Sequence, residues 1–131
     1  MNPRLLILAI LSSSTVLLSG CGWLYNGFGA YPPVVVATEN SGDELKLSHG
    51  QRLFVRLPFK GEAGYEWMLR EPQVSAVKAE GAPDQNKDEG IEVWTFTPVR
   101  DGQQTLRLEY RQPYDYFTVP AESVSYNVTV E

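Results

Sequence analysis

Residues 124–130 have the sequence VSYNVTV, in which Val124, Tyr126, Val128 and Val130 occupy every second position. Successive side chains of an extended strand point to opposite faces, so these four side chains share one face. Valine and tyrosine are also residue types that strands favour. The stretch therefore predicts a β-strand with one apolar face turned toward a core.

The same period of two recurs upstream, and no helix-length amphipathic segment interrupts it. The predicted strands span residues 44–47, 53–57, 65–69, 74–79, 91–97, 105–110 and 124–130. Turn signals lie at His49-Gly50 and Asp101-Gly102. About seven short strands predict an all-β fold, an immunoglobulin-like antiparallel β-sandwich with Trp67 as its core tryptophan. A small barrel is the alternative that the pattern leaves open.

The N-terminus resembles a bacterial lipoprotein signal peptide. Arg4 precedes an apolar run, Leu5 to Leu18, that is short for a membrane span and leads into Leu18-Ser19-Gly20-Cys21. An aliphatic residue, two small residues and a cysteine resemble the lipobox. This resemblance implies a lipid on the Cys21 sulfur, cleavage before Cys21 and an acyl chain on the new amine, an effectively permanent membrane anchor. The alternative is an ordinary secretory signal with an incidental cysteine.

The lipobox divides the chain into a signal peptide at 1–20, a lipid-anchored tether at 21–40 and a sandwich domain at 41–131. Removal of the signal leaves about 110 residues, enough for one domain with its own core. The predicted location is the bacterial cell envelope. Gly22, where an aspartate would follow the cysteine of a retained lipoprotein, favours the outer membrane by resemblance to known sorting rules.

Charge and residue types exclude several classes of function. The sequence has 16 acidic and 11 basic residues, and Arg4 leaves with the signal, so nucleic acid is not an expected partner. Cys21 is the only cysteine and His49 the only histidine. Because the lipid would occupy Cys21, no free cysteine remains to pair with His49, and a metal site would lack its usual ligands. We expect no enzymatic activity, no cofactor and no metal.

Loops are the remaining candidates for function. The connections at 59–64, 81–90 and 111–122 would share one end of an immunoglobulin-like sandwich, where alternate connections emerge together. The last connection contains Tyr114 and Phe117 between prolines, and aromatic side chains on a stiffened loop are typical interface anchors. The alternative is that Tyr114, Tyr116 and Phe117 fold back and cover the open end of the sandwich.

From about Asp43 to Glu131 the chain resembles the chagasin-like inhibitors of papain-type cysteine proteases. Gly64-Tyr65-Glu66-Trp67, which follows Leu57-Pro58, resembles the end of the family's first loop, Asn-Pro-Thr-Thr-Gly and then aromatic-x-Trp. Lys87–Gly90 falls at the glycine-rich second loop. Tyr110–Tyr114 (YRQPY) resembles the third loop, which carries Arg-Pro-Trp.

The resemblance implies a reversible inhibitor whose three loops wedge into a protease cleft. It assigns the contact to Lys60, Gly61, Glu62, Ala63, Gly64, Tyr65, Trp67, Asp88, Glu89, Gly90, Arg111, Gln112, Pro113 and Tyr114. The chain departs from the family at Lys60–Ala63, which replace Asn-Pro-Thr-Thr, and at Gln112 and Tyr114, which replace arginine and tryptophan.

Two functions follow from these observations. The first is a lipid-anchored inhibitor whose partner is a papain-like cysteine protease. The second is an envelope protein-binding or scaffolding lipoprotein with the same fold and no inhibitory activity, which the altered loops favour. In both cases acyl chains on Cys21 would hold the protein at the membrane.

Overall fold

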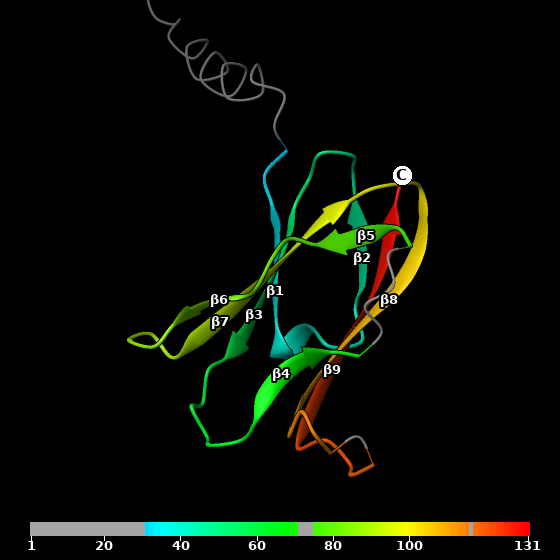
Figure 1. Cartoon of the computed structure of the whole chain (residues 1–131). Helices are drawn as coiled ribbons and strands as arrows, with labels where there is room; N and C mark the ends of the chain where they lie inside the picture. The colour runs from blue at the N-terminus through cyan, green and yellow to red at the C-terminus, as the bar shows by residue number, and fades with distance from the viewer. Residues whose placement is uncertain (1–30, 71–74, 116) are drawn as a thin grey trace, which may run out of the picture. The chain divides into compact units, whose positions relative to one another are not determined.

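The computed structural model describes residues 31–70, 75–115 and 117–131, and a compact unit spans Pro32–Glu131. The predicted signal peptide and residues 21–30 of the predicted tether, Cys21 included, lie outside the described residues. The unit consists of two β-sheets packed face to face (Figure 1). No helix among the described residues is long and apolar enough to cross a membrane.

Among the described residues, nine strands form the two sheets. One sheet has the order β1 (Val34–Ala37), β3 (Leu53–Pro58), β7 (Ile91–Pro98) and β5 (Val77–Ala79), and β6 (Asp84–Asn86) also pairs with β7. The other has the order β2 (Glu44–Leu47), β9 (Glu122–Val130), β8 (Gly102–Arg111) and β4 (Glu66–Leu69). A short 3₁₀ helix, η2 (Thr38–Asn40), carries the chain from β1 in one sheet to β2 in the other.

The all-β immunoglobulin-like sandwich predicted from the sequence is confirmed, and two separate sheets replace the barrel alternative. Two features differ from the antiparallel, seven-strand expectation. The edge strands β1 and β2 pair in parallel with β3 and β9. The short strands β1 and β6 have the sequences VVVA and DQN, in which apolar and polar residues do not alternate, so neither carries a period-two signal. The sheet thus begins at Val34, inside the segment expected to be tether.

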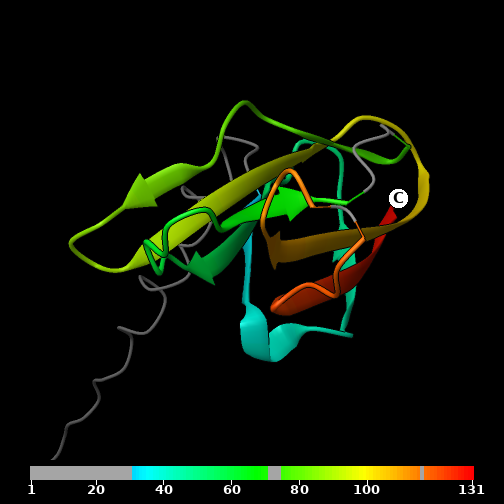
Figure 2. The ribbon, with the colours of Figure 1, turned by 60° about the horizontal axis from the view of Figure 1, so that its bottom comes forward.

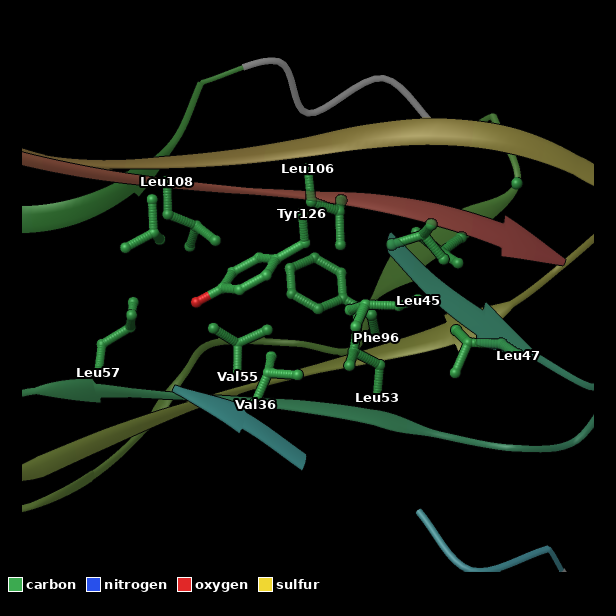
Figure 3. Close-up of a cluster of buried hydrophobic side chains, with 14 of the residues drawn as sticks. Val36, Leu45, Leu47, Leu53, Val55, Leu57, Phe96, Leu106, Leu108 and Tyr126 are labelled. Atoms are coloured by element: carbon green, nitrogen blue, oxygen red, sulfur yellow. The ribbon is translucent and has the colours of Figure 1, made fainter. Parts of the chain in front are cut away.

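The core lies between the inner faces of the two sheets (Figure 3). The alternation seen in 124–130 is realised, since Val124, Tyr126, Val128 and Val130 of β9 are all buried. The Tyr126 hydroxyl donates a 2.7 Å hydrogen bond to the Ala37 carbonyl, which ties η2 to the core. Burial, reinforced by the charges of Glu39 and Asp43, raises the pKa of Tyr126 to about 12.

The chain enters this domain at the end where β3 begins. Val34 pairs with Leu53, its N–H bonds the Arg52 carbonyl at 2.9 Å, and Gln51 Nε2 bonds the Pro32 carbonyl at 2.9 Å. Strand β3 then runs from Leu53 to Pro58 toward the other end of the sandwich. The start of β1 and the loop after Pro58 therefore lie at opposite ends of the domain (Figure 1).

Candidate functional site

Three loops meet at the end of the sandwich reached by β3. We call this end the rim and define it by the first loop (59–65), the second loop (87–90) and the third loop (112–115 and 117–121). Figure 2 brings these loops toward the viewer. Strand register explains why they meet: Pro58 pairs with Ile91, and Glu66 pairs with Arg111. The first loop therefore starts beside the second loop and ends beside the third.

The first loop is a tight turn built on two glycines. Gly61 and Gly64 have φ values of 68° and 82°, a conformation that other L-residues adopt at a cost. The Tyr65 N–H bonds the Glu62 carbonyl at 3.2 Å, which closes the turn. Gly64 also lies against the third loop, because a Cβ atom there would be 3.4 Å from the Tyr114 hydroxyl. The conformation and the close approach both favour glycine at position 64.

Aromatic rings support the first loop from below. The buried Tyr110 ring of β8 stacks on Tyr65 at 5.6 Å and packs against Trp67 at 5.4 Å, measured between ring centroids. Trp67 Nε1 donates a 3.0 Å hydrogen bond to the Pro58 carbonyl where the loop leaves β3. Burial of the Tyr110 hydroxyl, reinforced by the charge of Glu62, raises the pKa of that group. The base of the first loop is therefore fixed by the sandwich.

Lys60 joins the first loop to the start of β9. Its ammonium pairs with the Glu122 carboxylate and lies 5.4 Å from the centroid of the Tyr110 ring. The hydrogen bond that the Lys60 ammonium donates to Glu122 raises the pKa of Lys60, and the negative charges of Glu122 and Glu62 act in the same direction. The lysine is therefore engaged within the protein and also remains accessible at the rim.

The second loop is the turn of the hairpin between β6 and β7. Its Gly90 has a φ of 68°, and the Gly90 carbonyl accepts a 2.8 Å hydrogen bond from the Phe59 N–H of the first loop. The Glu89 N–H bonds the Asn86 side chain at 3.1 Å, which closes the turn. Lys87, Asp88 and Glu89 are all exposed, so this part of the rim carries a net negative charge.

The third loop exposes apolar side chains. Phe117 is 99% exposed, Val119 89% and Tyr114 74%. The Asp115 carboxylate accepts a 3.3 Å hydrogen bond from the Phe117 N–H, and the Asp115 N–H bonds the Gln112 carbonyl at 3.1 Å. Tyr114 and Phe117 therefore do not fold back over the end of the sandwich, whereas Tyr116 lies outside the described residues.

Arg111 anchors the third loop from inside the protein. Its side chain is 5% exposed; Nη1 donates to the Asp115 carbonyl at 3.1 Å, and Nη2 lies 3.1 Å from Glu109 Oε1. Arg70 flanks the same carboxylate at 3.6 Å. Glu109 is itself buried, although the alternation in β8 predicts an outward, solvated side chain. Arg111 thus positions the loop, and its guanidinium is not free at the rim surface.

The structure brings the sequence-predicted loop residues together at one end. Gly64, Tyr65 and Tyr114 lie in one cluster, Gly90 touches the first loop through Phe59, and Trp67 lies beneath. The exposed members also include Gly61, Glu62 and Ala63, while Gln112 and Pro113 are half-buried at the base of the third loop.

Several residues that shape the rim were not predicted from the sequence: Phe59, Asp115, Val119, Glu122 and, in the lining of a hollow beneath the first loop, Glu92. Asp115 carries a local signal, since an aspartate after Pro-Tyr is a typical turn residue. Glu122 is 62 residues from Lys60 and carries none. No group of three His, Cys, Asp or Glu side chains suited to a metal ion occurs among the described residues.

Comparisons with known proteins agree with this fold. The family model described as chagasin family peptidase inhibitor I42 matches residues 46–130. The cysteine protease inhibitor EhICP2 from Entamoeba histolytica has a similar structure, with a TM-score of 0.66 and 18% identity over 76% of this chain and 96% of that chain. No curated protein sequence gives a significant match.

Two further solved structures have the same fold. The solution structure of Amebosin has a TM-score of 0.56 and 19% identity over 76% of this chain and 99% of that chain. PbICP-C, solved in complex with falcipain-2, has a TM-score of 0.51 and 16% identity over 77% of this chain and 100% of that chain.

Proposed function

Because this chain belongs to the chagasin family of peptidase inhibitors, we propose that its rim wedges reversibly into the active-site cleft of a papain-like cysteine protease. The main support for this proposal is that noncovalent interactions hold the three loops together at the rim. The Phe59–Gly90 hydrogen bond connects the first and second loops, and the approach of Gly64 to Tyr114 connects the first and third. The Lys60–Glu122 ion pair joins the first loop to the start of β9, directly after the third loop. A wedge fixed in this way loses little conformational entropy on docking.

The surface of the rim suits such a cleft. Gly61, Ala63 and Gly64 let the backbone of the first loop approach a catalytic residue closely. Tyr114 and Phe117 offer apolar area that is exposed in the free protein and would be buried by a cleft wall. The aromatic cluster beneath keeps the first loop in place while this occurs.

We also propose that the protein is a lipoprotein of the bacterial envelope, anchored through Cys21 at the outer membrane. The lipobox supports the anchor. Pro32 and Val34 lie at the end opposite the rim, and this supports an anchor that is compatible with inhibition, because the tether would join the domain at the far end from the three loops. Cys21→Ser should move the protein from the membrane fraction to the soluble fraction, and retention at the membrane would contradict the anchor.

Inhibition is tested by titrating papain-like proteases with the full chain in non-ionic detergent. We expect submicromolar, reversible inhibition without cleavage of the inhibitor. The matched variant has Lys60–Ala63 replaced by Asn-Pro-Thr-Thr. If only the variant inhibits, the wild-type loop has lost the activity. If neither inhibits well above a micromolar concentration, which corresponds to about −8 kcal/mol, the proposed function is wrong.

A second function is favoured by Lys60 and Glu62. They place two charged side chains in the first loop, one of them already paired with Glu122, where the family has uncharged residues. These charges fit a protein-binding module of the envelope whose partner is not a protease. Crosslinking in intact cells should then capture such a partner through the third loop, and Tyr114→Ala with Phe117→Ala should weaken the capture.

A further inference from the structure

Glu92 is a buried carboxylate that the proposed wedge does not use. It lies on the inward-facing side of β7, in line with Trp94 and Phe96, at the end of the core nearest the rim. Its exposed fraction is 3%. Gln85 Nε2 donates to one carboxylate oxygen at 3.0 Å, and Trp94 Nε1 donates to the other at 2.7 Å.

Both donors to Glu92 are neutral. Within residues 31–70, 75–115 and 117–131, no lysine, arginine or histidine lies within ion-pair distance of this carboxylate. A carboxylate accepts up to about four hydrogen bonds, so its acceptor capacity is half used. A buried charge without an opposite charge is unfavourable for folding. The position is therefore unusual for a residue with a purely structural role.

Glu92 lines two hollows that adjoin each other. One is a groove of about 520 Å³ between β4 and the β6–β7 hairpin, also lined by Glu66, Met68 and Trp94. The other is a smaller hollow of about 180 Å³ beneath the first loop. Glu66, Trp67, Gln85 and Glu92 line both, so the groove continues directly into the rim.

The lining of the groove indicates its occupant. It contains two carboxylates, Glu66 and Glu92, two tryptophans, and no lysine, arginine or histidine. Carboxylates and indole rings together favour a guanidinium group, which binds carboxylates through paired N–H groups and stacks on aromatic faces. β4 is also an edge strand, with β8 as its one strand neighbour among the described residues, so extended backbone could lie along it.

We propose that this groove binds an arginine side chain of the protein that docks on the rim, and that Glu92 receives its guanidinium. The identity of the arginine-bearing protein as a protease rests on the proposed function. The arginine site itself does not, because it follows from the groove and from Glu92. Such a contact would add selectivity for a target with an arginine beside its cleft.

The site is tested with the full chain in non-ionic detergent micelles, labelled with ¹⁵N at the tryptophan indoles. The probe is the peptide acetyl-Ala-Arg-Ala-amide, and the matched probe carries citrulline, which has the shape of arginine without its charge. We expect the arginine peptide to shift the Trp94 Nε1–H signal in a saturable way at millimolar concentration, and the citrulline peptide to leave it unchanged. Equal shifts with both peptides, or none with either, would overturn the proposal.

Glu92→Gln should weaken arginine-peptide binding at least about tenfold, whereas Glu44→Gln, which removes a carboxylate from the other sheet, should not. The thermal midpoint of Glu92→Gln should equal or exceed that of the wild type, because the variant removes an uncompensated buried charge. Unchanged peptide affinity in Glu92→Gln would contradict the site. If that variant does not fold, the comparison of the arginine and citrulline peptides on the wild-type protein still tests the site.

Protease assays distinguish a failure of the arginine site from a failure of the proposed inhibitor function. If the arginine peptide binds through Glu92 but no protease is inhibited, the site stands and the inhibitor function fails. If proteases with an arginine beside the cleft are inhibited equally by wild type and Glu92→Gln, the inhibitor function stands and the arginine site fails.

Discussion

The first and third loops lie side by side at the rim, yet they are held in different ways. The first loop is fixed by groups outside itself: the Gly90 carbonyl, the Glu122 carboxylate and the indole of Trp67. The third loop is held by hydrogen bonds of Arg111 and Asp115, within the loop and at its base. Its apolar side chains are exposed to solvent. The sandwich therefore preorganises the first loop, and we expect a partner to bury the apolar side chains of the third loop.

The largest effect should come from removing the support of the first loop. Trp67→Ala deletes the ring that packs on Tyr110 and the donor to the Pro58 carbonyl, and we expect it to lower the free energy of unfolding by about 3–5 kcal/mol. Urea titration measures this change. Trp67→Phe keeps much of the packing and should lose less. An unaltered midpoint for Trp67→Ala would show that the first loop does not depend on the sandwich.

The corresponding change in the third loop is Arg111→Met. It leaves the buried Glu109 carboxylate with only Arg70 nearby and releases the Asp115 carbonyl, so we expect a loss of about 3 kcal/mol. Arg111→Lys keeps the charge but not the paired donors and should recover part of the loss. Hydrogen exchange should speed up at Asp115 and Phe117 and stay slow at Phe59. Equal acceleration at all three amides would contradict separate anchoring of the two loops.

A smaller effect is expected where the two loops touch. Gly64→Ala places a side chain on a residue with a φ of 82° and brings its Cβ to 3.4 Å from the Tyr114 hydroxyl. The backbone conformation alone should destabilise the protein by about 1–2 kcal/mol. Gly50→Ala is the matched control, because its φ is 84° and no atom lies within 4 Å of the added group. If Gly64→Ala loses more stability than Gly50→Ala, the difference measures the effect of the added methyl group on the contact between the loops.

The Lys60–Glu122 pair should make a modest contribution that depends on pH. The pKa of Lys60 is raised above 10.5 in the folded protein, so the contribution is fully present below 10.5 and is lost as pH rises through the folded value. Lys60→Met should remove this alkaline dependence. The pKa values of Tyr110 and Tyr126 are also raised, so stability above pH 10 must be compared in a background that carries both Tyr110→Phe and Tyr126→Phe. An identical alkaline decline with and without Lys60 would show that the pair does not link the loops.

The smallest effect on stability should occur at the tip of the third loop. Phe117→Ala removes a side chain that is 99% exposed, so the free energy of unfolding should change by less than about 0.5 kcal/mol. Affinity for a partner should fall by at least about tenfold if the ring is buried on binding. Val99→Ala, a partly exposed residue away from the rim, is the control for affinity. A large loss of stability in Phe117→Ala would contradict the exposed placement.

Much of the sandwich could be predicted from local patterns. The period of two in 53–57, 105–110 and 124–130 reappears as the buried faces of β3, β8 and β9, because one face of each strand must be apolar wherever it packs on a second sheet. The parallel pairings of β1 and β2 could not be predicted in this way. Their partners lie 19 and 83 residues away along the chain (Val34 with Leu53, and Glu44 with Asn127), and periodicity carries no information about distant neighbours.

The candidate site was predictable only in part. The glycines and aromatic residues at 60–67 and 110–114 identify loops with special conformations, and this local information is present in the sequence. The sequence does not reveal that neighbouring residues in these loops have different roles. Arg111 is buried and Tyr114 is exposed, although both belong to one short motif. The burial of each side chain depends on neighbouring residues that come from other parts of the chain.

The sequence by itself determined the class of fold, since alternating apolar residues can bury one face only as strands in packed sheets. It also determined which loops have unusual composition. Tertiary structure decided that these loops meet at one end, that Lys60 pairs with Glu122, and that Glu92 is enclosed without an opposite charge. Burial and pairing depend on contacts between residues far apart in the chain, and strand pairing together with the packing of the two sheets brings those residues together.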